Sequence, residues 1–151
     1  PVEDNLEVFE ENLKIFPYKN IDIFPCGLSD KNKDGAPIRL NGYAPGFNIF
    51  SAEMNNIRLP LRTIDYLVDS GEIEKINFLK LDVEGSEMPT LRGARNSIDR
   101  FKPKLAISIY HKPDDFFEII NYIKENHKYY KLYVDHYTVH REETVVYGLP
   151  Y

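Results

Sequence analysis

Apolar residues recur along most of this chain at intervals that predict alternating helices and strands. Large apolar side chains stand at helical spacing across residues 4–16, in a stretch whose first turn is rich in acids. An apolar run at 21–24 predicts a short strand that leads into small and turn-forming residues. Thr63 can cap a short helix that ends before Gly71.

The clearest pattern begins at residue 76. An apolar run at 76–82 ends in an acid, a helical pattern follows at 87–100, and a second apolar run occupies 103–110. The helical stretch places on one face Met88, Leu91, Ala94 and Ile98. This order and length are those of a βαβ unit, whose strands are parallel and whose crossover is right-handed.

Another helix and two further strands follow this unit. The helix is predicted over 114–126, and its inward face carries Phe116, Ile119, Ile120 and Ile123. Apolar runs at 131–134 and 143–149 predict strands, and the connection between them is too short for a helical crossover, so they pair antiparallel. The sequence predicts an α/β fold with a mostly parallel sheet, helices on its faces and an antiparallel C-terminal edge.

The segment 31–61 lacks this regularity. Glycines and prolines interrupt it repeatedly, and it allows at most a short strand near 38–40. A loop of this length is either a lid or poorly ordered. Because 151 residues suffice for one core, we expect residues 1–151 to form a single domain that includes this long irregular loop.

Composition excludes several classes of protein. The net charge of -5 gives no general attraction to nucleic acid. No apolar run reaches the roughly 18 residues of a membrane helix, and no signal peptide is visible, so we expect a cytoplasmic protein without a membrane partner. The single cysteine, Cys26, excludes an intrachain disulfide framework. The first residue is Pro, and the opening residues suggest a fragment of a longer chain.

Candidate chemistry stands at the ends of the predicted strands. In an open parallel sheet, ligands bind outside the carboxyl ends of the strands. Ser29 and Asp30 follow the first strand, Asp82 and Glu84 follow the second, and His111 follows the third. Because the strands of a βαβ unit are parallel, the second and third ends emerge at one edge. Two titratable groups that face one crevice can form an acid–base site.

These residues also fit a second interpretation. Asp82 and Glu84 fit equally well as caps of the helix that follows them. His111 fits an exposed loop histidine. His136 and His140 have the spacing of a metal pair on a helix, but they lie in a predicted hairpin connection. No metal ligands are therefore assigned from the sequence.

Several motifs of the chain stand in a familiar order. KLDVEGSE occupies 80–87, LRGA occupies 91–94, and KPKLAISIYH occupies 102–111. This series resembles the C-terminal part of the FkbM-type S-adenosylmethionine-dependent methyltransferases. The opening residues 1–13, the GLSD turn at 27–30 and the closing ETVVYGLP are also similar to that family, so the resemblance covers nearly the whole chain.

The chain departs from the family pattern at its start. The family's first strand, its Gly-rich cofactor loop and the acid that holds the ribose are absent before Pro1. GYAPG at 42–46 lacks the spacing of a dinucleotide fingerprint and does not replace that loop. The resemblance therefore implies a Rossmann-like class I methyltransferase fold that is truncated at its N-terminus and forms one partial domain.

The resemblance implies methyl transfer from S-adenosylmethionine to a substrate hydroxyl. The adenine side of this cofactor would be lined by Leu28, Ser29 and Asp30. Asp82 would lie beside the methionine part or the reacting centre, where a carboxylate suits a cationic sulfonium. Glu84 and His111 are the candidates for the base that removes the hydroxyl proton.

Two alternatives stay open. One is metal-dependent methylation with Asp82 and Glu84 as Mg²⁺ ligands, which ranks lower because two carboxylates do not complete an octahedron. The other is a non-catalytic α/β binding or interaction domain without a complete cofactor site. For the enzyme, we expect a small-molecule or glycan hydroxyl as acceptor, selected by 31–61. A missing N-terminal part would expose apolar surface and favour a homo-oligomer.

Overall fold

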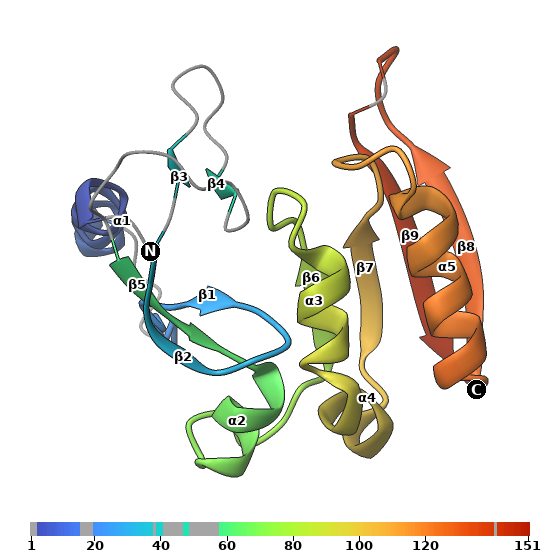
Figure 1. Cartoon of the computed structure of the whole chain (residues 1–151), viewed down its shortest axis with the longest axis horizontal. Coiled ribbons are helices and arrows are strands. Elements are labelled where there is room, and N and C mark those ends of the chain that lie inside the picture. The colour runs from blue at the N-terminus through green and yellow to red at the C-terminus, as the bar shows by residue number, and fades with distance from the viewer. Residues whose placement is uncertain (1–2, 16–19, 38, 41–46, 49–57, 141) are drawn as a thin grey trace.

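The computed structural model describes residues 3–15, 20–37, 39–40, 47–48, 58–140 and 142–151. Helices and strands alternate from residue 58 to residue 136, whereas the elements described between residues 27 and 62 are all strands (Figure 1). The helices are α1 (Glu3–Ile15), α2 (Ile64–Asp69), α3 (Glu87–Arg92), α4 (Arg95–Phe101) and α5 (Asp115–Asn126). Within the described part of the chain, no helix combines the length and apolar character needed to cross a membrane.

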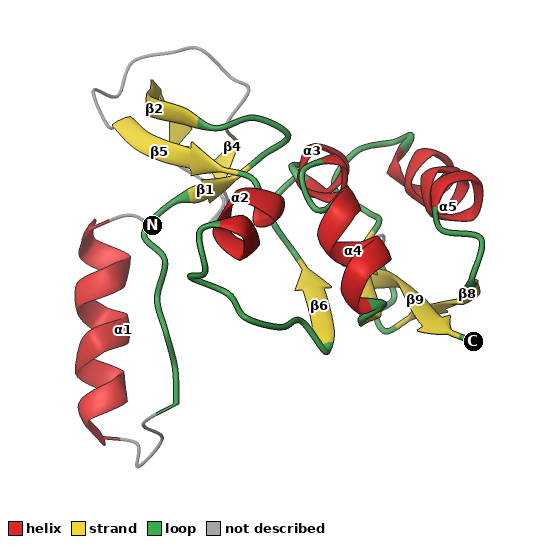
Figure 2. Cartoon of the chain, turned by 90° about the horizontal axis from the view of Figure 1, so that it is seen from below, coloured by secondary structure: helices red, strands yellow, loops and turns green. Residues whose placement is uncertain are grey.

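The strands form three sheets. They are β1 (Gly27–Leu28), β2 (Lys33–Pro37), β3 (Arg39–Leu40), β4 (Phe47–Asn48), β5 (Arg58–Arg62), β6 (Phe78–Leu81), β7 (Lys104–Ser108), β8 (Tyr130–His136) and β9 (Thr144–Pro150). Their order is β1-β5-β2 in the first sheet, β3-β4 in the second and β6-β7-β9-β8 in the third. The third sheet packs one face against α3, α4 and α5 (Figure 2).

Strand direction agrees with the sequence only in part. The β6–β7 pair is parallel, as the βαβ pattern predicts, and the β8–β9 pair is antiparallel, also as predicted. Among the described strands, β1–β5 is also parallel, whereas β2–β5, β3–β4 and β7–β9 are antiparallel. Two of the described sheets are therefore mixed and the β3–β4 sheet is antiparallel, so the predicted predominance of parallel pairing is not seen in them.

The core lies between the β6-β7-β9 part of the third sheet and its helices. Fully buried aliphatic side chains come from every layer of this region: Leu81, Leu91, Ile98, Leu105, Ile107, Ile119, Ile123 and Val146. The predicted inward face of α5 is confirmed at Ile119 and Ile123 but is wrong at Phe116, which is 40% exposed. Phe116 lies in the first turn of α5, whereas the buried Ile119 and Ile123 lie in its second and third turns.

Two other predicted elements differ in the structure. Residues 20–26 form no strand, and the pairing begins only at β1, because Gly27 and Leu28 are the residues that meet a partner in β5. The segment predicted to be irregular, 31–61, contains β2, β3, β4 and most of β5. Its residues 41–46 and 49–57 lie outside the described part of the chain.

The helix predicted over 87–100 is two helices that meet at Gly93 and Ala94. A Cβ atom at Gly93 would lie 2.1 Å from the carbonyl oxygen of Ser29, so only glycine allows this approach of two backbones. The carboxylate of Asp65, in α2, accepts hydrogen bonds from the backbone N–H groups of Ser97 (2.8 Å) and Asn96 (3.1 Å) at the start of α4. The helix break therefore joins the β1-β5-β2 region to the third sheet.

We expect Gly93→Ala to lower the free energy of unfolding by about 3 kcal/mol, because the added methyl group meets a backbone oxygen that has no room to retreat. Urea unfolding followed by circular dichroism measures this loss. Gly71→Ala is the matched control, since its Cβ would meet nothing within 4 Å and only the positive φ of 81° is strained. Equal stability of the two variants would contradict the close approach at Gly93.

Candidate active site

The candidate active site lies where β6 and β7 end. Asp82 directly follows β6, and His111 follows β7 after a short extension. The parallel register pairs Leu81 with Ile107, so both strands deliver their following residues to the same edge of the sheet. Figure 1 shows β6 behind α3 and next to β7. The sequence-based expectation that Asp82 and His111 share an edge is therefore confirmed.

A tight turn after β6 brings further acids to this edge. Glu84 and Gly85 both have positive φ angles, of 54° and 90°, so the chain reverses within two residues. The turn is closed by a hydrogen bond from the N–H of Ser86 to the carbonyl oxygen of Val83 (3.1 Å). The ammonium group of Lys112, next to His111 in the chain, donates a hydrogen bond to the carbonyl oxygen of Gly85. The turn and the end of β7 are thus held together.

Three carboxylates surround the imidazole of His111. Its Nε2 atom lies 3.6 Å from Oδ1 of Asp82 and 3.6 Å from Oε2 of Glu84. Its Nδ1 atom lies 2.9 Å from Oε1 of Glu87. The side chain of His111 is only 10% exposed, whereas those of Asp82 and Glu84 are 31% and 45% exposed. The two outer carboxylates can therefore meet a ligand, and the imidazole lies behind them.

Glu87 is the site residue that sequence reasoning missed. It is completely buried in the first turn of α3, where its Oε1 atom accepts a hydrogen bond from the N–H of Val83 (2.8 Å). An acid in the first turn of a helix is normally taken as a solvated group that favours the helix dipole. The sequence signal for the burial of Glu87 is its spacing from Leu91. Glu87 precedes this buried residue by one helical turn and so lies on the same face of the helix.

The surroundings of Asp82 keep its carboxylate charged. Burial acts to raise the pKa of Asp82, but hydrogen bonds from Lys80, Ser108 and Tyr110 outweigh it and hold that pKa below its ordinary value. The Nζ atom of Lys80 lies 3.0 Å from Oδ2, and the hydroxyl of Tyr110 lies 3.2 Å from Oδ1. Asp82 is therefore an ionised carboxylate at neutral pH.

The Glu87–His111 contact shifts both partners in opposite directions. Burial acts to raise the pKa of Glu87, but His111 and the N–H of Val83 outweigh it and lower that pKa. Burial acts to lower the pKa of His111, but the contact with Glu87 and the negative charges of Glu84 and Asp82 outweigh it and raise that pKa. The imidazolium form of His111 is therefore favoured more than in an ordinary histidine.

The three residues predicted to line the adenine side of the cofactor, Leu28, Ser29 and Asp30, do not join this cluster. Ser29 is buried, and its N–H donates to the carbonyl oxygen of Arg62 (3.0 Å). Asp30 is exposed. Leu28 lines an apolar hollow of about 450 Å³ together with Phe78, at the beginning of β6 rather than at its end. Among the described contacts, none links these predicted cofactor residues to Asp82 or His111.

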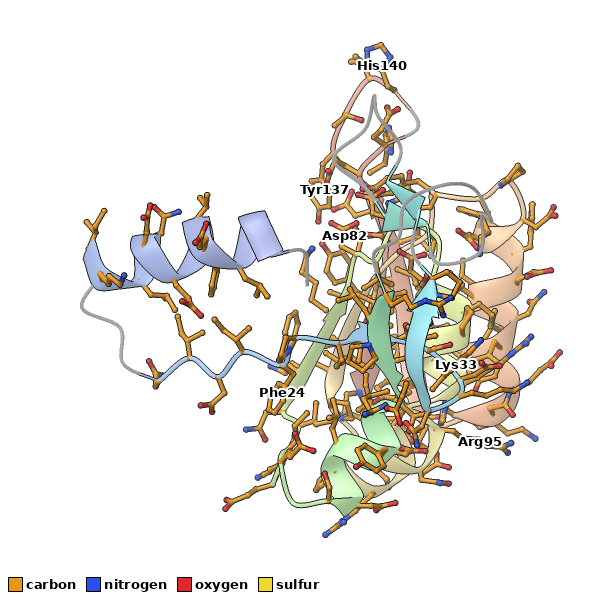
Figure 3. The ribbon with its side chains drawn as sticks, turned by 60° about the vertical axis from the view of Figure 1, so that its left-hand side comes forward. Phe24, Lys33, Asp82, Arg95, Tyr137 and His140 are labelled. Atoms are coloured by element: carbon orange, nitrogen blue, oxygen red, sulfur yellow. The ribbon has the colours of Figure 1, made fainter. Side chains whose placement is uncertain are left out.

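The other pair of histidines stays apart from the site. His136 ends β8, and its Nδ1 atom lies 2.8 Å from the hydroxyl of Thr144. Figure 3 shows His140 at the tip of the β8–β9 connection, away from Asp82. By contrast, one oxygen each of Asp82 and Glu87 and one ring nitrogen of His111 all lie within 4.8 Å of one another, a spacing that can hold a metal ion.

Comparisons with known proteins agree with the geometry of the fold. Residues 1–131 match a family model described as the methyltransferase FkbM domain. The structure is similar to the crystal structure of a methyltransferase FkbM from Methylobacillus flagellatus KT, with a TM-score of 0.76 and 28% sequence identity. That similarity covers 99% of this chain and 35% of the other, so the chain spans about a third of that protein's length. No curated protein sequence matches. The chain belongs to the FkbM methyltransferase domain family.

Proposed function

We propose that the protein containing this chain transfers a methyl group from S-adenosylmethionine to a hydroxyl group of a small molecule or glycan. The convergence of Asp82, Glu84 and His111 at one sheet edge carries this proposal. Membership of the FkbM family supports the methyltransferase part of it. The proposal includes a Rossmann-like class I fold for the complete domain, supported by the parallel β6–β7 pair and its helical crossover.

The charge of Asp82 fits this cofactor. S-adenosylmethionine supplies its methyl group from a positively charged sulfonium, which an ionised carboxylate stabilises. Asp82 is ionised and partly exposed, so it can lie beside that charge. The exposed carboxylate of Asp30 can make a polar contact with the adenosine part, and buried Ser29 would support the turn from behind. Leu28, in β1, packs against the hydrophobic core and would support the same turn.

The reaction requires removal of one proton. As the substrate oxygen forms a bond to the methyl carbon, the carbon–sulfur bond breaks and the hydroxyl proton passes to a base. Glu84 is the better placed of the two candidate bases, because its side chain is 45% exposed and that of His111 is only 10% exposed. The raised pKa of His111 also makes its neutral, proton-accepting form less available. We therefore assign the role of the base that accepts the proton to Glu84, and His111 supports the site from behind.

We expect the full protein to move a radiolabelled methyl group from S-adenosylmethionine to at least one acceptor in a panel of sugars, glycans and small alcohols. Asp82→Asn should lower turnover more than tenfold, because it removes the negative charge beside the sulfonium. The control is Asp69→Asn, at an exposed position of α2. Wild-type turnover in Asp82→Asn would remove this residue from the mechanism. Tight binding of an acceptor without methyl transfer would favour a binding domain instead.

We expect Glu84→Gln to reduce kcat by about a hundredfold while the KM for S-adenosylmethionine changes little, because loss of a positioned base slows the chemical step. The substitution keeps the size of the side chain in a residue with positive φ. Steady-state kinetics with both substrates varied separate the two constants. A kcat within twofold of the wild-type value would show that another group accepts the proton.

A further inference from the structure

We propose that Asp82, Glu87 and His111 bind a divalent cation of the Mn²⁺ or Zn²⁺ type at the edge formed by β6 and β7. The evidence for binding of the cation is the geometry of these residues alone. Its use in methyl transfer rests on the proposed function above. The ligands differ from the Asp82 and Glu84 pair that the sequence suggested, because the structure adds a buried carboxylate and an imidazole to the cluster.

The three donor groups come from three separate elements that meet at one point. Asp82 follows β6, Glu87 begins α3, and His111 follows β7. Their donor atoms lie within 4.8 Å of one another. Bonds from Zn²⁺ to nitrogen or oxygen are about 2.0–2.2 Å long, so the donor atoms would move closer together around a bound cation.

Glu87 gives an independent reason to expect a ligand. Its side chain has no exposed surface, and among the described groups its Oε2 atom has no hydrogen-bond partner. A buried charge is retained in proteins when it is paired or coordinates a metal. His111 partners only the other oxygen, Oε1, so half of the carboxylate is left for an additional group.

The charges of the cluster favour a cation as well. Asp82, Glu84 and Glu87 place three carboxylates around one imidazole. Lys80 compensates part of this charge, but its side chain is 62% exposed and reaches only Asp82. The distances of 3.6 Å from His111 to Asp82 and Glu84 are longer than a good hydrogen bond. A cation between His111 and Asp82 can make shorter bonds to both side chains.

The donor set indicates the kind of cation and its use. Imidazole suits Zn²⁺ and related transition metals, and carboxylates suit Mn²⁺ and Mg²⁺, so one nitrogen with two carboxylates favours Zn²⁺ or Mn²⁺ over Mg²⁺, which prefers oxygen ligands alone. Three protein ligands leave a position open, as in catalytic zinc sites. A substrate hydroxyl at that position would lose its proton more readily, and the exposed carboxylate of Glu84 stands beside it to accept that proton.

We expect isothermal titration of the full protein with MnCl₂, and separately with ZnCl₂, to show one site per chain. Electron paramagnetic resonance of Mn²⁺ provides a second measure of binding. Glu87→Gln and Asp82→Asn should each weaken binding at least about tenfold, since each removes a charged ligand. Asp99→Asn is the matched control, because Asp99 also contacts a buried histidine, His127 at 2.8 Å, but outside the site.

These experiments test the cation site separately from the proposed methyl transfer. Absence of Mn²⁺ and Zn²⁺ binding at millimolar concentration, or unchanged binding in both variants, would overturn the cation site while leaving the proposed methyl transfer intact. Loss of binding in the two variants with retention in the control would support it, whether or not methyl transfer is found. Glu87→Gln changes a buried residue, and this variant can fail to fold. In that case the binding measured for Asp82→Asn, at a partly exposed position, decides whether the cation site exists. Activity that survives EDTA would overturn the catalytic use of the cation.

Discussion

The buried carboxylate of Glu87 is the constraint on which the candidate site depends. A charge removed from water is stable in a protein only with partners that replace its hydration. The N–H of Val83 and the imidazole of His111 supply them, one from the turn after β6 and one from the end of β7. The parallel β6–β7 register brings both partners within reach. The fold therefore cannot satisfy Glu87 without also placing Asp82 and Glu84 around His111.

A second constraint joins this site to the first half of the chain. The approach of the Ser29 carbonyl to Gly93 leaves no space for a side chain. The carboxylate of Asp65, in α2, accepts a hydrogen bond from the backbone at the start of α4. Both contacts lie at the break between α3 and α4, one helix away from Glu87. Because α3 carries Glu87 and ends at this break, the position of the β1-β5-β2 region and the orientation of the candidate site are set by the same short segment.

The sequence predicted the elements whose signals are local and missed those that depend on distant contacts. The apolar runs around Asp82 and His111 have strong periodicity, so the parallel pair and its shared edge could be predicted. The break at Gly93 could not, because it arises from Ser29, which is remote in the chain. Residues 21–24 look like a strand but find no partner in the described sheets. An acid in the first turn of a helix is normally solvated, so the spacing of Glu87 from Leu91 is a weak signal for its burial, and its partner His111 is remote in the sequence.

The separation between the acid–base cluster and the predicted adenine-side residues has a consequence for the mechanism. Asp82, Glu84, Glu87 and His111 are all held by β6, α3 and β7, and none of their described contacts involves Leu28 or Asp30. In the proposed mechanism, the residues that act on the acceptor hydroxyl therefore lie within one βαβ unit, apart from the residues assigned to the adenosine part of the cofactor. Under this proposal, a change at Leu28 or Asp30 need not disturb the contacts among Glu84, Glu87 and His111. Family membership identifies the scaffold, whereas the carboxylates around His111 give a physical reason to assign a reaction to it.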